Sequence, residues 1–399
     1  MRRNDVIYLA GSEEVIVRPV VPFDQEVCEF LETLSKEILR DAALKAYTDV
    51  VSFAFWIRKG NMQKQKELYE ESNGLEKCRI GKGLIFHIAP SNVPINFAYS
   101  FVFGLLAGNS NIVRVSSKNF PQAALLCKKV QEVMNREEYA SIKQSNAIIK
   151  YERNKEITDY FSSVCDIRVI WGGDLTIEDI RKSPMKARSK EIVFADRYSF
   201  GIICPDAILE MSEKERGHLA EQFYNDTYLM DQNACSTPHF ILWKSDDADK
   251  VKKAQQYFWS SVYETAKKYD LADIKASDKY TDLCLFAVRA EENCKVKRYG
   301  NLLYVVDLEK IPEEMTNLRG RFGMFYQCRI ENLREIRAGI TEKVQTVAVV
   351  GVNKQEIWNF VMENHLTGID RIVPFGSTLD IGLVWDGYDL VSEMSRIII

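Results

Sequence analysis

One cysteine lies in a segment that suits a nucleophile. Cys235 is part of Asp231-Gln-Asn-Ala-Cys-Ser-Thr-Pro238, where small and amide-bearing residues leave a thiol accessible and offer hydrogen-bond donors. A thiolate acts as a nucleophile when it is exposed and lies in positive potential. A buried structural cysteine is the ordinary alternative, and the segment makes the two interpretations about equal.

A second candidate is the turn Pro90-Ser-Asn92-Val-Pro94, which follows the apolar run Gly83–Ala89. Each proline restricts itself and the residue before it, so the turn is rigid. The carboxyl end of a parallel strand is where open α/β sheets bind ligands. Asn92 could donate its amide N–H to a developing oxyanion there, or it could simply cap the next helix.

Two further clusters follow strand-like runs. Trp171-Gly-Gly-Asp174 would let a pyrophosphate approach a helix N-terminus. Arg114, Lys118 and the two serines between them would lie at the end of the next strand, where an adenosine ribose is usually bound. Taken singly, the first cluster is better explained as an ordinary loop and the second as a solvated basic strand end.

The elements that would position these residues alternate regularly. Residues 24–73 have helical spacing, and between residues 83 and 194 short apolar runs alternate with helical segments in units of roughly 25 to 35 residues. A second series of strands and helices begins near Phe200. This alternation predicts an α/β fold built of βαβ units with parallel sheets.

The composition excludes several classes of protein. The 399 residues carry a net charge of −4 and are 46% apolar, which is ordinary for a globular protein and gives no basic surface for nucleic acid. The longest apolar run, Phe97–Gly108, is too short to span a bilayer, and no secretion signal is seen. The nine scattered cysteines form no C-x-x-C pair, so we expect reduced thiols in a cytoplasmic protein without a metal site.

Jointly, the motifs resemble the aldehyde dehydrogenase superfamily, and most closely its LuxC-like branch, the acyl-CoA (fatty-acyl) reductases. The resemblance extends from about residue 80 to the C-terminus. It is carried by Pro90–Pro94 in place of P-W-N-F-P, Gly108-Asn109 with Arg114 in place of G-N-(x)4-K, His87–Pro90, Trp171–Gly173, Asn233–Ser236, Gly368–Gly376 and Trp385–Leu390.

The resemblance implies an aldehyde-dehydrogenase-like α/β fold. Residues 1–204 would form N-terminal helices and a Rossmann-type dinucleotide-binding domain, residues 205–375 an α/β catalytic domain, and residues 376–399 a return with an oligomerisation strand. Cys235 would take the acyl group, and Asn92 with the backbone N–H of Cys235 would form the oxyanion hole. The dinucleotide would be bound by Ala89, Pro90, Ser91, Arg114, Ser116, Ser117, Lys118, Gly172, Gly173 and Phe322.

The sequence also departs from the superfamily at the water-activating base. Val193 stands opposite the glutamate that activates water in hydrolytic aldehyde dehydrogenases, although Glu191 or Asp196 could supply that base in a shifted register. An enzyme that exchanges acyl groups with a thiol and reduces them needs no such base. This departure favours reduction over hydrolysis.

The cofactor motifs depart as well. Gly320 stands in place of the glutamate in the E-x-F-G-P segment, matched here by Gly320-Arg-Phe322-Gly323. Ser117 stands where many NAD-dependent relatives carry an acid, and serines beside Arg114 and Lys118 suit a 2′-phosphate better. We therefore expect NADPH as the cofactor.

The expected reaction is reduction of an acyl thioester to an aldehyde through an S-acyl cysteine. The acyl donor would be acyl-CoA or an acyl group delivered by a partner acyl-protein synthetase, and the resemblance implies a homo-oligomer. Two alternatives stay open. One is an aldehyde dehydrogenase working oxidatively, with or without CoA. The other is a non-catalytic subunit that binds an acyl-transferring partner.

Overall fold

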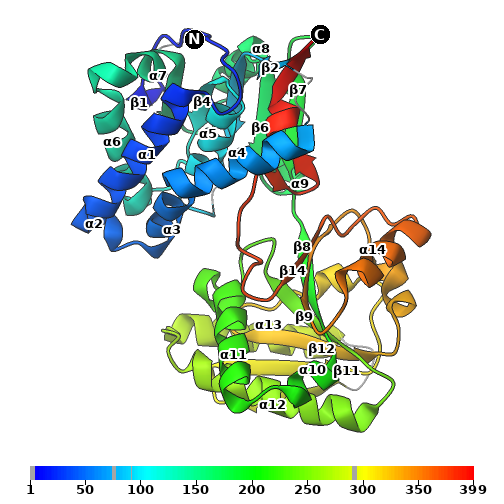
Figure 1. Cartoon of the computed structure of the whole chain (residues 1–399). Coiled ribbons are helices and arrows are strands. Elements are labelled where there is room, and N and C mark those ends of the chain that lie inside the picture. The colour runs from blue at the N-terminus through cyan, green and yellow to red at the C-terminus, as the bar shows by residue number, and fades with distance from the viewer. Residues whose placement is uncertain (1–4, 74–77, 91, 290–293) are drawn as a thin grey trace. The chain divides into compact units, whose positions relative to one another are not determined.

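The computed structural model describes residues 5–73, 78–90, 92–289 and 294–399, and the chain forms two compact units (Figure 1). Unit 1 is Met1–Ala195 with Gly382–Ile399, and unit 2 is Asp196–Ile381. The unit boundaries, after residues 195 and 381, differ from the domain boundaries expected from the sequence, after residues 204 and 375. The strand that begins at Tyr198 pairs only within unit 2, and the last residues return to unit 1.

Unit 1 contains a six-stranded sheet in the order β1-β5-β4-β3-β6-β7. Strand β1 is antiparallel at one edge, and the other five are parallel. The strands are β1 (Ile7–Gly11), β3 (Leu84–Ile88), β4 (Ser110–Arg114), β5 (Asn146–Lys150), β6 (Ile167–Trp171) and β7 (Lys190–Phe194). All five residues of β3 are buried, as expected of a strand covered on both faces.

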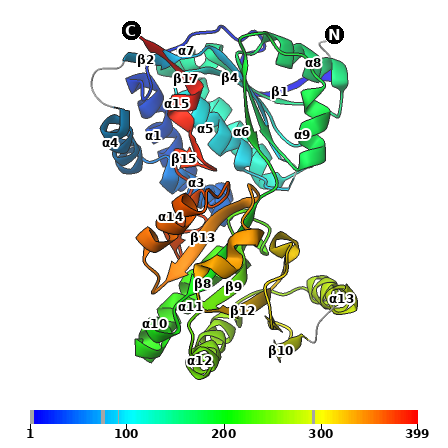
Figure 2. The same cartoon turned by 90° about the vertical axis from the view of Figure 1, so that its right-hand side faces the viewer.

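Helices cover both faces of this sheet (Figure 2). Alternate residues of β3, including Phe86, pack with Ile157 and Ile177 of α8 and α9, whereas His87 faces Ser100 of α5. The helices are α1 (Gln25–Arg40), α2 (Ala42–Lys45), α3 (Thr48–Trp56), α4 (Lys59–Asn73), α5 (Asn96–Leu106), α6 (Pro121–Met134), α7 (Ala140–Ser145), α8 (Lys155–Val164) and α9 (Asp174–Arg181). The predicted helical character of residues 24–73 is confirmed.

Unit 2 contains a seven-stranded sheet in the order β10-β11-β12-β9-β8-β13-β14, parallel except for β10. The strands are β8 (Tyr198–Ile203), β9 (Pro238–Lys244), β10 (Lys295–Tyr299), β11 (Leu303–Leu308), β12 (Met324–Ile330), β13 (Val344–Val350) and β14 (Arg371–Pro374). The predicted α/β class with parallel sheets is therefore confirmed in both units.

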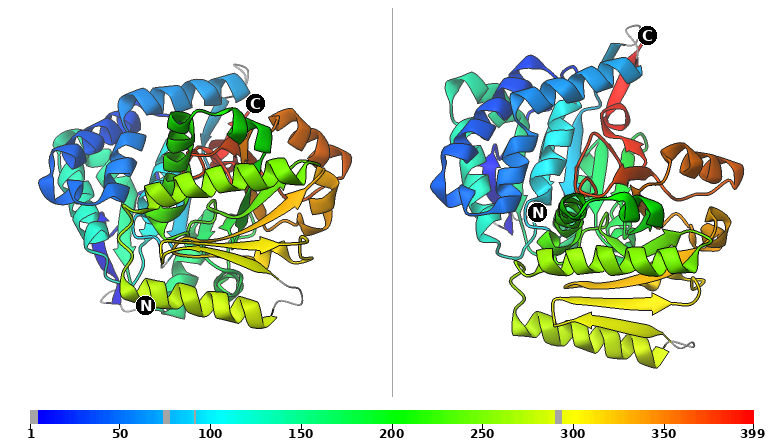
Figure 3. Two further views of the ribbon diagram at one scale, coloured as in Figure 1. Left: turned by 90° about the horizontal axis from the view of Figure 1, so that it is seen from below. Right: turned by 60° about the horizontal axis from the view of Figure 1, so that its bottom comes forward.

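The two faces of the second sheet carry separate cores. Phe223 of α11 and Trp259 of α12 belong to one core, and Leu283 of α13 and Phe360 of α14 belong to the other. Figure 3 shows α12 and α13 on opposite faces of the sheet. The helices are α10 (Pro205–Glu210), α11 (Glu213–Thr227), α12 (Ala248–Ala266), α13 (Asp273–Arg289) and α14 (Lys354–Glu363).

The C-terminal residues form small structures in unit 1. Strand β15 (Val384–Trp385) pairs with β16 (Tyr388–Asp389), and after the short helix α15 (Leu390–Met394) the last strand β17 (Ser395–Ile398) pairs with β2 (Cys78–Gly81) of the same chain. In the part of the chain that the structure describes, no helix is both long and apolar enough to cross a lipid bilayer.

Candidate active site

Cys235 lies in a short, strained loop between the turn η3 (Tyr228–Met230) and strand β9. The loop begins with Asp231 and Gln232 at φ values of 53° and 61°, a left-handed conformation that non-glycine residues adopt at a cost of about 1–3 kcal/mol each. Strain of this kind persists only where the surroundings fix the backbone. Cys235 itself is partly exposed.

One anchor of the loop is Gln232, whose side chain is 2% exposed. Its amide nitrogen donates to the carbonyl of Met324 at 2.9 Å, and its amide oxygen accepts the N–H of Gly323 at 2.6 Å. These residues follow Phe322, which has a φ of 57°. Within unit 2, the segment predicted to contact the cofactor through Phe322 is thus bonded to the cysteine loop.

A second anchor comes from the sheet. The hydroxyl of Ser199 on β8 donates to the carbonyl of Cys235 at 2.8 Å and accepts the N–H of Thr346 on β13 at 3.2 Å. The hydroxyl of Thr237 donates to the carbonyl of Asp226 at 2.9 Å. The backbone on both sides of the thiol is therefore fixed to the core of unit 2.

The Asp226 carboxylate, at the end of α11, is buried and holds the segment that follows β14. It accepts the N–H of Gly376 at 2.6 Å and the N–H of Thr378 at 3.1 Å. Burial raises the pKa of Asp226 to about 6, and the backbone hydrogen bond from Gly376 opposes this shift. This role could not be predicted from the sequence, because Asp226 lies inside an ordinary helical pattern.

A cavity of about 1180 Å³ opens beside the cysteine loop, entirely within unit 2. It is lined by the loop residues Gln232, Asn233 and Ala234, by the side chain of His239, and by residues of α13 and of the segment 308–321. Its apolar wall includes Leu285, Phe286, Leu308, Ile311, Leu318 and Tyr326. The space is large enough for a substrate with an extended chain.

His239 is a neutral neighbour of this cavity. Its Nδ1 donates to the carbonyl of Gly320 at 3.0 Å, and its ring stacks on Tyr198 with the centroids 5.8 Å apart. Burial lowers the pKa of His239 to about 4, with the charge of Arg319 as the next cause. The imidazole is therefore uncharged at neutral pH.

The predicted oxyanion residue Asn92 lies in unit 1, exposed in the turn between β3 and α5. Ser91, also predicted for this turn, lies outside the described residues. The predicted cofactor residues of unit 1 gather at the carboxyl ends of three neighbouring strands. Ala89 and Pro90 follow β3, Arg114, Ser116, Ser117 and Lys118 end or follow β4, and Gly172 and Gly173 follow β6.

The end of β4 is cationic. The Arg114 guanidinium lies 4.5 Å from the centre of the Tyr151 ring and donates to the carbonyl of Tyr151 at 3.4 Å. A cavity of about 500 Å³ lies between this strand end and α6, and the charged side chains that line it are Lys118, Lys128 and Lys150. No acidic side chain is among its lining residues.

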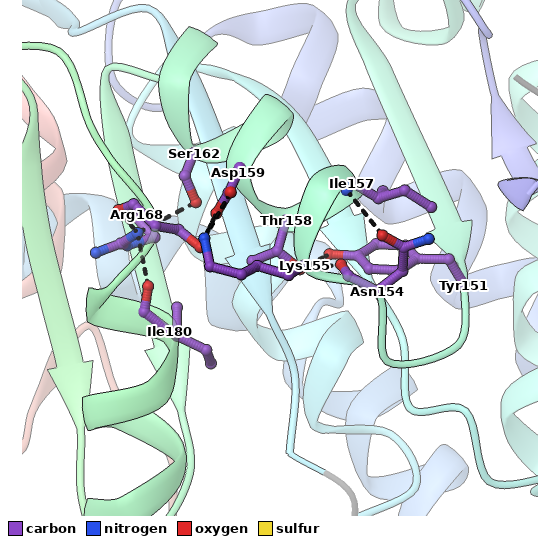
Figure 4. Close-up of polar contacts among 10 residues, drawn as sticks. Tyr151, Asn154, Lys155, Ile157, Thr158, Asp159, Ser162, Arg168 and Ile180 are labelled. Atoms are coloured by element: carbon purple, nitrogen blue, oxygen red, sulfur yellow. Dashed lines mark hydrogen bonds and ion pairs between the residues drawn. The ribbon is translucent and has the colours of Figure 1, made fainter. Parts of the chain in front are cut away.

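The two acids that could replace the missing water-activating base are both ion-paired. Glu191 accepts from Nη2 of Arg168 at 2.6 Å and from Nε of Arg181 at 2.7 Å. Arg168 is itself buried and bonded to the Ser162 hydroxyl and the Ile180 carbonyl (Figure 4).

Asp196, the other acid, belongs to unit 2. Both of its oxygens accept from the Arg319 guanidinium at 2.9 Å. Within the described ranges, no group of three histidine, cysteine or acidic side chains is placed to hold a metal ion.

Comparison with known proteins gives a family and a fold. The family model described as acyl-CoA reductase (LuxC) matches residues 23–397. No curated protein matches the chain by sequence. The solved structures it resembles are largely aldehyde dehydrogenases.

Three of these solved structures illustrate the likeness. A salicylaldehyde dehydrogenase from Pseudomonas putida G7 has 13% identity over 95% of this chain and 85% of its own, with a TM-score of 0.63. An oxidoreductase from Marinobacter aquaeolei has 11% identity over 98% and 88%, with a TM-score of 0.65. A glyceraldehyde-3-phosphate dehydrogenase from Methanocaldococcus jannaschii, complexed with NADP, has 15% identity over 94% and 86%, with a TM-score of 0.58.

The identities are low, so these structures show the fold alone: both units have the architecture of an aldehyde dehydrogenase. The family match covers nearly the whole chain and confirms the resemblance inferred from the motifs. The chain belongs to the acyl-CoA reductase (LuxC) family and is an oxidoreductase with the fold of an aldehyde dehydrogenase.

Proposed function

We propose that the protein reduces an acyl thioester to an aldehyde through an S-acyl intermediate on Cys235, with NADPH as the reductant. The acyl group would arrive as acyl-CoA or on a partner acyl-protein synthetase. The observation that carries the proposal is a partly exposed cysteine in a strained, firmly anchored loop, in a chain of the acyl-CoA reductase family.

The thiolate of Cys235 attacks the acyl carbonyl, and the oxygen becomes an oxyanion. The amide of Asn92 and the backbone N–H of Cys235 are the proposed donors to that oxyanion. One such donor typically contributes about 3–4 kcal/mol to transition-state stabilisation. Collapse of the tetrahedral intermediate expels the donor thiol and leaves the acyl group on sulfur. After reduction, the thiohemiacetal on Cys235 breaks down to the aldehyde and the free thiolate.

Several features of unit 1 fit a phosphate-bearing dinucleotide. The Nε of Arg114 is buried without a hydrogen-bond partner among the described residues, and Lys118 with its neighbouring lysines faces a cavity that has no acidic lining residue. A Cβ added at Gly173, which caps α9, would meet no atom within 4 Å, so a phosphate has room there. Arg114 and Lys118 would hold the 2′-phosphate. When bound, a reduced nicotinamide supplies the hydride.

The ion pairs of Glu191 and Asp196 favour reduction over hydrolysis. A general base must be free to take a proton from water. Glu191 is engaged by two arginines and Asp196 by one, and Val193 between them has no basic group. The S-acyl group is then protected from water and is available for reduction.

Aldehyde oxidation with and without CoA tests this proposal. We expect purified protein with aldehyde and NADP+ to form acyl-CoA when CoA is present, and to form almost no free acid when CoA is absent. Free acid produced at a comparable rate without CoA would show that a water-activating base exists and would overturn the reductive assignment. The forward assay, oxidation of NADPH across acyl-CoA chain lengths, defines the acyl group.

A further inference from the structure

We propose that Arg371 stabilises the thiolate of Cys235 and holds it ready for attack. This inference rests on the proposed role of Cys235 as the nucleophile. Arg371 is the first residue of β14 and belongs to the motif Gly368–Gly376, to which the sequence assigned no chemical role.

The strand register brings Arg371 to the level of the cysteine loop. In neighbouring strands of unit 2, Arg371 is the pairing partner of Thr346, and Thr346 is the partner of Ser199. Ser199 is the residue whose hydroxyl holds the Cys235 carbonyl. Adjacent strands are about 4.8 Å apart, so the backbone of Arg371 lies about two strand spacings from that anchor.

The guanidinium is fixed by backbone carbonyls. Its Nη1 donates to Thr378 at 2.7 Å, and its Nη2 donates to Ser377 at 2.8 Å and to Asp380 at 2.6 Å. The same segment is held from its other side by the Asp226 carboxylate. These carbonyl oxygens orient the guanidinium and carry no net charge of their own.

The charged groups around Arg371 include the thiol. Desolvation lowers the pKa of the Arg371 guanidinium, and the charges of Asp380, Asp226 and Cys235 oppose that shift, in decreasing order. Asp226 shares its charge with two backbone N–H groups. Asp380 is exposed, so water screens its charge.

Two other basic residues near the loop, Lys275 and Arg319, are ion-paired. Asp231, at the start of the loop, accepts from Lys275 at 2.9 Å, and Arg319 is paired with Asp196. His239 is neutral at physiological pH, as its pKa of about 4 requires. A nearby cation favours the thiolate, which is the nucleophilic form, and Arg371 is the cation to which we assign this role.

The test is alkylation of Cys235 by iodoacetamide across a range of pH, with the Cys235 peptide quantified by mass spectrometry in the intact full-length protein. For Arg371→Met we expect the rate at pH 7 to fall about tenfold, because a tenfold smaller thiolate fraction corresponds to one pH unit. Arg371→Lys keeps the charge and should lose less. An unchanged pH profile in Arg371→Met would overturn the proposal.

A second variant, which is expected to speed alkylation rather than slow it, controls for misfolding of Arg371→Met. Asp380→Asn removes an exposed negative charge while leaving its carbonyl bond to Arg371, so alkylation of Cys235 should become faster. Labelling of the buried Cys328 reports loss of structure in unit 2. If Arg371→Met exposes Cys328, the Asp380→Asn result decides: a faster rate supports the proposal, and an unchanged or slower rate overturns it.

The alkylation profile separates this inference from the proposed function. It needs neither acyl donor nor cofactor. If Cys235→Ala still accepts an acyl group, the nucleophile assignment fails even where the Arg371 profile behaves as expected. If only the profile is unchanged, Cys235 remains the nucleophile and Arg371 has no part in activating it.

Discussion

The two units use similar parallel sheets in opposite ways. In unit 1, the predicted ligand-binding residues follow the carboxyl ends of β3, β4 and β6, which is where open α/β sheets usually bind ligands. In unit 2, Cys235 comes just before β9, at the amino ends of the strands. A cofactor site needs small residues and helix N-termini, whereas a nucleophile needs a backbone that is held rigidly.

The units also differ in how they keep buried polar groups. In unit 1, His87 is fully satisfied, because its ring nitrogens bond Ser100 at 2.8 Å and Asn111 at 3.0 Å. In unit 2, the buried Asp226 bonds two backbone N–H groups and has a raised pKa. The first arrangement stabilises a core, and the second fixes the segment that follows β14.

The largest effect on stability is expected for Asp226→Ala. The change leaves the N–H groups of Gly376 and Thr378 without their acceptor, and each unsatisfied buried donor costs about 1–3 kcal/mol. The free energy of unfolding from urea titration should fall by about 2–6 kcal/mol. Asp206→Ala, which removes an exposed acid of the same unit, is the matched control and should have little effect.

As the pH falls, unit 1 should lose stability before unit 2. Burial lowers the pKa of both His87 and His239 to about 4, so each contributes stability that is complete above pH 6.5 and is lost as the pH falls toward 4. Each loss amounts to about 3 kcal/mol. The protonation of Asp226 acts in the opposite direction. Because its pKa is raised to about 6 in the folded protein, unit 2 gains stability as the pH falls from 6 to 3.8. That gain offsets the loss from His239 in unit 2. Among the described residues of unit 1, no carboxyl group shows a raised pKa that would offset the loss from His87.

Hydrogen exchange measured by mass spectrometry at pH 7 and pH 4.5 checks this difference. Amides of β3 and β4 should lose more protection than amides of β8 and β9. Asp226→Asn removes the offset, so unit 2 should then become as acid-sensitive as unit 1. If unit 2 of the unaltered protein lost protection first at pH 4.5, the predicted difference in acid stability between the units would be wrong.

The smallest effect on turnover is expected for Glu191→Gln. Loss of a general base typically costs about 10²–10⁴-fold in rate. If Glu191 only pairs with Arg168 and Arg181, kcat should stay within about twofold, since no proton transfer is lost. Asp196→Asn serves as the parallel change in unit 2. A hundredfold loss of acid-forming activity in either variant would identify that residue as a water-activating base and would indicate hydrolysis as the reaction.

Much of the fold could be predicted because apolar runs mark buried strands. The runs at Gly83–Ala89, Asn146–Lys150 and Ile167–Trp171 became β3, β5 and β6. Strand β12 is difficult to predict from the sequence, because Gln327 and Arg329 interrupt its apolar pattern. Gln327 is nonetheless fully buried, since its side-chain oxygen accepts both Trp243 and Trp259 indole N–H groups at 2.9 and 2.7 Å. Such partners cannot be seen in the strand's own sequence.

The candidate site could also be predicted in part, where its residues lie in short sequence motifs. Cys235 and the residues of the unit 1 strand ends lie in short motifs, so the sequence singled them out. Asp226 and Ser199 lie in other elements and contact the cysteine loop only after folding. Nothing in their local patterns separates them from ordinary helix and strand residues.

The central claim is that Cys235 receives the acyl group. Incubation with radiolabelled acyl-CoA, followed by denaturation and gel separation, measures this directly. The account predicts label on the unaltered protein and on Cys204→Ala, which removes another partly buried thiol of unit 2. It predicts no label and no NADPH oxidation with Cys235→Ala. Covalent label on a folded Cys235→Ala variant would contradict it.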